Sequence, residues 1–122
     1  MKFNLQERLI NFAVLILEIT ENLPETKGRN HLSGQLTRCG TAPALHYGEA
    51  QSAESRKDFV HKMKIALKEL RESLICLTII QRKKYAADEK IVNSISELNE
   101  LISVFVKSIE TARKNLKNKR EH

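Results

Sequence analysis

The chain carries its most informative stretch at residues 38–50, RCGTAPALHYGEA, followed at residues 55–59 by SRKDF. The first segment predicts a helix with a kink near Pro43, because a proline inside a helix removes one backbone donor and clashes with the carbonyl four residues earlier. The second segment predicts the start of a new helix, since Ser55 and Asp58 have the spacing of a helix cap and its acidic partner. A kinked helix, a turn and a further helix are therefore expected here.

The rest of the chain repeats this helical pattern. Its 122 residues include only 4 glycines and 2 prolines, and 41% are hydrophobic, which favours one folded helical domain over residues 1–122. Apolar residues recur at steps of three and four, which lays them along one face of each helix. The pattern predicts four helices, at about residues 4–22, 30–51, 55–83 and 88–117. Four such helices with short connections predict an all-α fold, an antiparallel up-down-up-down four-helix bundle with a proline kink in the second helix.

Polar residues mark the predicted helix starts. Asn4 and Glu7 have the spacing of a cap and its reciprocal partner, as Ser55 has with the residue three positions later. Asn30 is the candidate cap of the second helix, and Asp88 is the candidate cap of the fourth.

The first helix carries a second apolar row on the side opposite its core face. A helix that is apolar on two sides must be covered on two sides, and a single layer of four helices covers only one. The row therefore predicts a subunit interface; the alternative is that it packs under a loop of the same chain. Its members are Phe3, Ile10, Val14 and Leu17.

The third helix carries a basic stripe roughly opposite its core face. A net charge of +6 favours a polyanionic partner, and cations clustered on one helix are typical of proteins that bind a phosphate backbone. Base stacking has little support, because aromatic residues make up only 5% of the chain. The alternative is an ordinary solvated face. The candidate nucleic-acid-binding residues are Lys57, His61, Lys64, Lys68 and Arg71 along the stripe, and Arg82, Lys83 and Lys84 at the helix end.

Three charged residues are predicted to form a structural network. Arg38 and Glu49 lie on the same side of the second helix, three turns apart, and Glu72 lies on the third helix beside its core face. Because buried charges persist only when they are paired, this network is expected to brace the kinked helix rather than to bind a ligand.

Nothing in the sequence indicates a catalytic residue, a metal or a cofactor. His46 and Glu49 form one pair, in the reverse order of the Glu-x-x-His pairs of di-iron bundles. Cys39 and Cys76 lack metal-binding spacing, and their apolar surroundings favour small buried side chains in a reducing compartment. The apolar run at residues 9–17 is too short to span a membrane and lacks the features of a secretory signal. A non-enzymatic, cytoplasmic protein is expected.

Three motifs carry a resemblance to a known family: RxGTAPxLHxGEA at residues 38–50, SxxDF at residues 55–59 and KIALKELRES at residues 64–73. In these motifs the chain resembles the small four-helix bundle proteins encoded within intervening sequences of bacterial 23S ribosomal RNA genes. The resemblance implies a bundle that assembles into rings, often pentamers. It also implies a relation to a similar bundle that binds nucleic acid and reverse transcriptase as an accessory factor of diversity-generating retroelements.

These observations together predict a non-enzymatic, homo-oligomeric accessory protein that binds RNA or DNA through the basic stripe. The alternative is a scaffold that binds an acidic protein and no nucleic acid.

Overall fold

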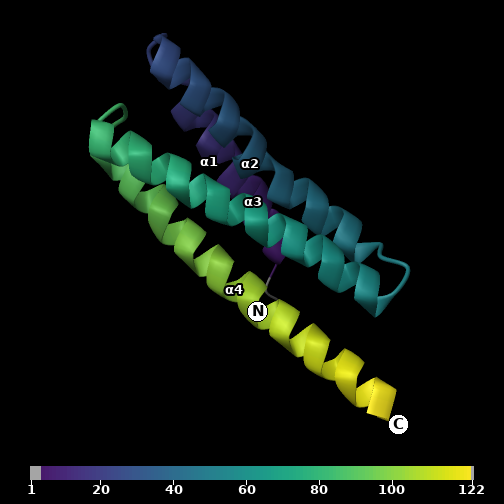
Figure 1. The fold of residues 1–122 in the computed structure, drawn as a ribbon. Coiled ribbons are helices and arrows are strands. Elements are labelled where there is room, and N and C mark those ends of the chain that lie inside the picture. Colours follow the sequence, from purple (N-terminus) through teal and green to yellow (C-terminus); the bar gives the residue numbers. More distant parts are fainter. Residues whose placement is uncertain (1–3, 122) are drawn as a thin grey trace.

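The computed structural model describes the backbone of residues 4–121 and the side chains of residues 4–117. Over this part the chain forms four helices and no strand: α1 (Leu5–Glu21), α2 (Lys27–Gln51), α3 (Arg56–Lys83) and α4 (Asp88–Glu121). Figure 1 shows them packed along one long axis, with the C-terminal end of α4 extending past the turn between α2 and α3. The all-α prediction is confirmed, and the arrangement is consistent with a four-helix bundle.

Local hydrogen bonds explain where α1 and α3 begin. Asn4 Oδ1 accepts the backbone N–H of Glu7, and Ser55 Oγ accepts the backbone N–H of Asp58, both at 3.0 Å. Each bond satisfies one of the backbone donors that a helix leaves free at its first turn. These two predicted caps are confirmed. At the other end of α3, Lys84 adopts a left-handed backbone with φ of 57°, which ends the helix.

α2 begins at Lys27, earlier than the predicted start at Asn30. The Thr26 hydroxyl is the cap, because it accepts the backbone N–H of Arg29 at 3.2 Å. The Arg29 guanidinium also lies over the Tyr85 ring, 4.5 Å from its centroid. This contact joins the first turn of α2 to the segment between α3 and α4.

α4 differs from the prediction at both ends. Asp88 is its first residue rather than its cap, since the Ile91 N–H bonds back to the Ala87 carbonyl at 3.3 Å. The helix also continues to Glu121 instead of ending near residue 117. Residues 108–121 contain no glycine or proline, so the sequence offers nothing that would stop the helix.

A single hydrophobic core runs along the bundle, and it confirms most of the predicted apolar faces. The largest fully buried side chains come from all four helices: Leu9, Phe12 and Ile16 from α1, Leu36 from α2, Met63, Leu70, Leu77 and Ile80 from α3, and Ile91, Leu98, Leu101 and Phe105 from α4. In the described part of the chain, no helix has a stretch that is both long and apolar enough to cross a membrane.

α1 approaches the backbone of α2 closely at Gly40. A Cβ built at this glycine would lie 2.8 Å from Cγ2 of Ile16, which is closer than carbon atoms pack. Nearby, the side-chain amide of Gln6 donates to the Ala44 carbonyl at 2.9 Å. The absence of a side chain at position 40 therefore sets how near the two helices can come.

α2 runs without interruption through Pro43, which is buried. Because proline has no N–H, the carbonyl four residues earlier, that of Cys39, receives no helical hydrogen bond from this position. The hydroxyl of Thr41, two residues before the proline, donates a hydrogen bond to the Thr37 carbonyl at 2.7 Å. The kink predicted near Pro43 stays a prediction.

We expect Gly40→Ala to destabilise the protein by about 1–3 kcal/mol, because the added methyl group forces Ile16 or the helix backbone to move. The free energy of unfolding in urea measures this loss. Gly34→Ala is the matched control: it makes the same change in the same helix, where no atom lies within 4 Å of the new Cβ.

The control variant should be more stable than wild type by roughly 0.5–1 kcal/mol, since alanine favours a helix over glycine. An equal rise in stability for both variants would contradict a tight α1–α2 contact.

Candidate nucleic-acid interface

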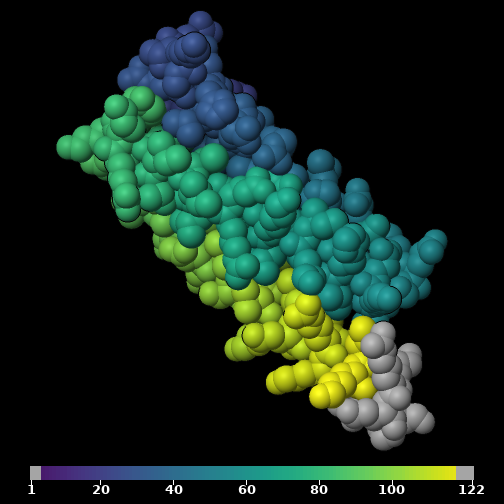
Figure 2. Space-filling view, in the orientation of Figure 1, coloured from purple at the N-terminus to yellow at the C-terminus, as the bar shows by residue number. Residues whose placement is uncertain are grey.

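The predicted basic stripe lies on the exposed face of α3. Lys57, His61, Lys64, Lys68 and Arg71 are all exposed, and they follow one another at steps of three and four residues. This spacing places them on one side of the helix, away from its buried residues. Figure 2 shows α3 as a band that crosses the visible face of the molecule without being covered by another helix.

The basic residues at the end of α3 form a second, separate cluster. Arg82, Lys83 and Lys84 are exposed, but Ile75 and Ile79 lie between them and the stripe with 62% and 42% of their surface exposed. The eight predicted residues therefore do not form one uninterrupted basic surface. They form two basic clusters with an apolar patch between them. The sequence analysis considered only the charged residues and therefore missed this apolar patch.

The permanent cations of the stripe carry uncompensated charge. Among the residues that the structure describes, the ion pairs are formed by other basic side chains. No ion pair is formed there by Lys57, Lys64, Lys68 or Arg71. Exposed cations without acidic partners attract polyanions over roughly a Debye length, about 8–10 Å at physiological salt. The face can therefore act as an electrostatic docking surface.

The Arg38 guanidinium joins α2 to α3 beside the stripe. It donates to Glu69, Glu72 and Gln35, each at 3.0 Å. The hydrogen bond to Glu72 and the charge of Glu69 raise the pKa of Arg38. The Arg38 side chain is 53% exposed, so this is a surface network rather than the buried brace that the sequence suggested. Arg38 offsets one of the two negative charges of Glu69 and Glu72, which share α3 with the stripe.

Glu49 lies outside this network, in contrast to the prediction. Its carboxylate is 3.8 Å from Nδ1 of His46, on the same helix. At 1.5 Å per residue, Arg38 and Glu49 are separated by about 16 Å along the axis, so a shared side of α2 does not bring them together. Over the described residues, no group of three His, Cys, Asp or Glu side chains is placed to hold a metal ion.

A second charged network, which the sequence analysis missed, joins α1 to α4. Arg8 contacts Glu97 through Nη2 and through Nε, the latter at 3.2 Å, and Glu100 at 3.3 Å. The hydrogen bond to Glu97 is the main cause that raises the pKa of Arg8. Glu97 and Glu100 share a face of α4, but sequence spacing does not show which helix supplies their partner.

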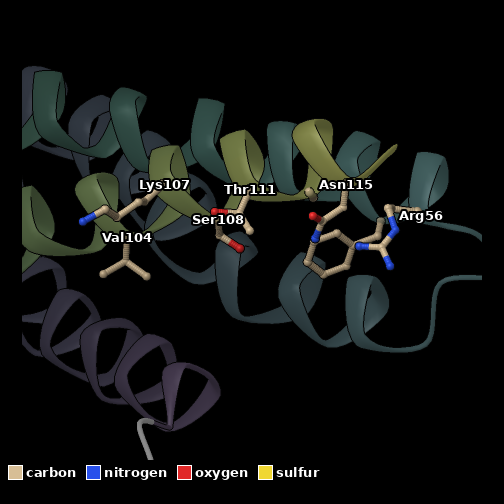
Figure 3. Close-up of a pocket in the computed structure, with 8 residues that line it drawn as sticks. Arg56, Val104, Lys107, Ser108, Thr111 and Asn115 are labelled. Carbon is tan, nitrogen blue, oxygen red and sulfur yellow. The ribbon is translucent and has the colours of Figure 1, made fainter. Parts of the chain in front are cut away.

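An open groove of about 460 Å³ lies between the start of α3 and the C-terminal half of α4. In Figure 3, Arg56 and Asn115 lie at one end, Lys107 lies at the other, and Ser108 and Thr111 lie between them. The groove thus offers two cations at its ends and hydroxyl groups along its length. Such groups can bind phosphate oxygens, but they do not converge on one point as they do in a catalytic site.

The second apolar row of α1 is partly open to solvent. Ile10 and Val14 are 42% and 49% exposed, while Leu17 is half-buried. Phe3, the fourth predicted member, lies outside the described residues. The subunit interface predicted for this row stays a prediction.

Comparisons with known proteins point to one family. The sequence model of the 23S rRNA-intervening sequence protein family matches residues 1–107. A similar solved structure is the crystal structure of a protein with unknown function from the S23 ribosomal protein family of Bacteroides thetaiotaomicron. Its TM-score is 0.79 at 27% sequence identity, and the match covers 87% of this chain and 98% of that chain. No curated protein matches the chain.

We expect Arg38→Gln to lower the melting temperature by a small amount that shrinks in molar salt. The substitution leaves Glu69 and Glu72 one turn apart without their shared cation, and salt screens the resulting repulsion. Thermal unfolding at low and high salt measures both effects. The control Glu49→Gln removes a charge that lies outside the network and should leave the melting temperature unchanged; equal losses from both variants would contradict the assignment.

Proposed function

The chain belongs to the 23S rRNA-intervening sequence protein family, and from this premise we propose that it is a non-enzymatic, oligomeric accessory protein that binds RNA or DNA. Binding takes place at the phosphate backbone, through the basic stripe of α3. The observation that carries the proposal is the row of exposed cations without acidic partners among the described residues. The family match and its solved relative give no indication of catalysis.

Recognition through this stripe depends on charge rather than on base sequence. Lysine side chains act as point charges on phosphate oxygens, and such contacts position a protein without reading bases. The cations follow one another along α3 at steps of about one turn, roughly 5.4 Å, so neighbouring side chains can reach successive phosphates of one strand. We therefore expect little preference among sequences.

Oligomerisation is the second part of the proposal. Ile10, Val14 and Leu17, continued by Phe3, form the subunit contact, and the family resemblance suggests a ring of five copies. A ring repeats the stripe around its circumference, so that one nucleic acid can contact several copies at once. Linked contacts of this kind raise the overall affinity without any stronger single contact.

The proposed bundle is antiparallel, with the up-down-up-down order expected from its short connections. Two hydrogen bonds support this order for α1 and α2: Gln6 pairs with Ala44, whereas Thr20, later in α1, pairs with Thr37, earlier in α2. A bend of α2 at Pro43 belongs to the same proposal, because the missing backbone donor weakens the helix there.

The alternative is a scaffold that binds an acidic protein. The exposed Ile75 and Ile79 favour this function, because an apolar patch flanked by two basic clusters suits a helix with acidic and apolar side chains. Such a partner would occupy the same face of α3. Nucleic-acid binding and its salt dependence separate the two functions.

We expect Lys64→Glu combined with Lys68→Glu to weaken the binding of unrelated RNA and DNA sequences by similar factors. The slope of log affinity against log salt should fall in magnitude by about 1 for each lysine replaced, because fewer counterions are released. Fluorescence anisotropy over a range of salt concentrations measures both. The fold should be retained, since both side chains point into solvent.

The matched control is Lys90→Glu combined with Lys114→Glu, which makes the same change in net charge at exposed positions of α4. This control should lose much less affinity than the α3 variant. The absence of any binding by wild type at low salt, or equal losses in both variants, would exclude the stripe as the interface and favour the acidic-protein scaffold.

We expect Val14→Lys to convert the oligomer to a monomer without loss of helix content. Burying an apolar row yields about 25 cal/mol per Å², and a charged side chain in the contact would have to lose its hydration. Sedimentation velocity gives the assembled mass, and circular dichroism gives the helix content. Val92→Lys is the control, since Val92 on α4 has a similar exposed fraction, 52% against 49%. A monomeric wild-type protein at micromolar concentration would overturn this part of the proposal.

A further inference from the structure

Two free thiols meet where α2 packs against α3, the most extensive helix contact in the bundle. Cys39 on α2 is buried, with 1% of its surface exposed, and Cys76 on α3 is only partly buried. Neither residue belongs to the basic stripe or to the apolar row of α1. Their position is therefore independent of the proposed function.

The position of Ser73 relates the two cysteines to each other. The Ser73 hydroxyl lies 3.2 Å from Cys39 Sγ, in the interior of the α2–α3 contact. Cys76 follows Ser73 by three residues, so its side chain projects from the same face of α3, about one turn further on. Cys76 lies close enough to Cys39 for each thiol to shift the pKa of the other.

This interaction makes the two thiols chemically different. The influence of Cys39 is the main cause that lowers the pKa of Cys76 to about 7, against the opposing effects of burial and of the Glu72 carboxylate, while the Arg38 guanidinium lowers that pKa further. The influence of Cys76, together with burial, raises the pKa of Cys39, and the Ser73 hydroxyl and the Arg38 charge only partly offset this rise. Cys76 is therefore the thiol that ionises more readily near neutral pH, and it is also the more exposed of the two.

We propose that Cys39 and Cys76 are a redox modification site, at which a hydroperoxide converts the two thiols into a disulfide that links α2 to α3. A partly exposed, nucleophilic sulfur beside a buried sulfur is the arrangement that such a site requires, because the first reacts and the second resolves. The assignment rests on the position of Cys76 one turn from Ser73, which contacts Cys39, and on the different exposure of the two cysteines.

The reaction balances in two steps. The Cys76 thiolate attacks the peroxide, an S–O bond forms, the O–O bond breaks, and hydroxide leaves, which gives a sulfenic acid at Cys76. The Cys39 sulfur then attacks the Cys76 sulfur, the S–S bond forms, the S–O bond breaks, and the hydroxyl group leaves as water with the proton of Cys39. The two sulfurs lose two electrons, and the peroxide takes them up.

The test uses the reduced full-length protein and hydrogen peroxide. We expect the intact mass to fall by two hydrogen atoms, the tryptic digest to contain a peptide pair joined through Cys39 and Cys76, and a dithiol reductant to reverse both changes. The initial rate should rise as the pH passes through about 7, where Cys76 loses its proton. The link also closes the loop that contains the α2–α3 turn, so it should raise the melting temperature.

Two variants distinguish the roles of the thiols. Cys39→Ser should still react with peroxide but stop at a sulfenic acid on Cys76, which dimedone traps, whereas Cys76→Ser should leave Cys39 reduced. Linked peptides that join two copies of the chain, faster modification of Cys39 than of Cys76, or no linked peptide at all would overturn the proposal. The intact mass and the peptide map of the wild-type protein show whether the Cys39–Cys76 disulfide forms, even if a variant fails to fold.

Discussion

Gly40 allows α1 to lie directly against the backbone of α2, because any side chain at that position would overlap Ile16. This contact depends on a missing side chain, and it fixes the rotation of α2 about its axis. With Gly40 facing α1, the two preceding residues are directed toward α3. Cys39 reaches Ser73 in the interior, and Arg38 reaches Glu72 at the surface. Three consecutive residues of α2 thus make three different contacts, and the placement of the other two depends on the glycine.

The same rotation affects the charge of the surface. α3 buries one side against its neighbours and leaves the side with Lys64 and Lys68 in solvent. Glu69 and Glu72 lie on the same helix as these lysines and weaken their positive potential, and Arg38, which binds both carboxylates, offsets part of this effect. An arginine on α2 therefore supports the charge of a face that belongs to α3. The electrostatic property that matters for the proposed function comes from the packing of two helices rather than from one sequence segment.

Those features of the fold that depend on neighbours in the sequence were predictable. Asn4 and Ser55 cap their helices as their spacing indicates, because each bond joins residues three positions apart. Features that depend on contacts between helices were not predictable in this way. The start of α2 was placed too late, and the first turn that follows the Thr26 cap contains the contact between Arg29 and Tyr85, which joins residues that lie far apart in the chain.

The candidate site shows the same limit. Helical periodicity correctly placed the lysines of α3 in solvent, since exposure follows from the position of the core face. Periodicity also placed Arg38 and Glu49 on one side of α2, yet their separation of about 16 Å along the axis prevents an ion pair. Across the helix contact Arg38 binds the predicted Glu72 and also Glu69, and the second pairing depends on the register between α2 and α3, which periodicity does not give.

The surface of α3 also limits how strongly a single copy can bind. The row contains few cations and ends at the exposed Ile75 and Ile79. Each phosphate contact contributes through counterion release, so affinity grows with the number of contacts and falls steeply with salt. A surface of this size gains most from repetition, because linked copies act at a high effective concentration along one nucleic acid. On the proposed function, the exposed apolar row around Val14 and the basic face of α3 thus act together. The apolar row joins the copies, and the joined copies make more phosphate contacts than one bundle can.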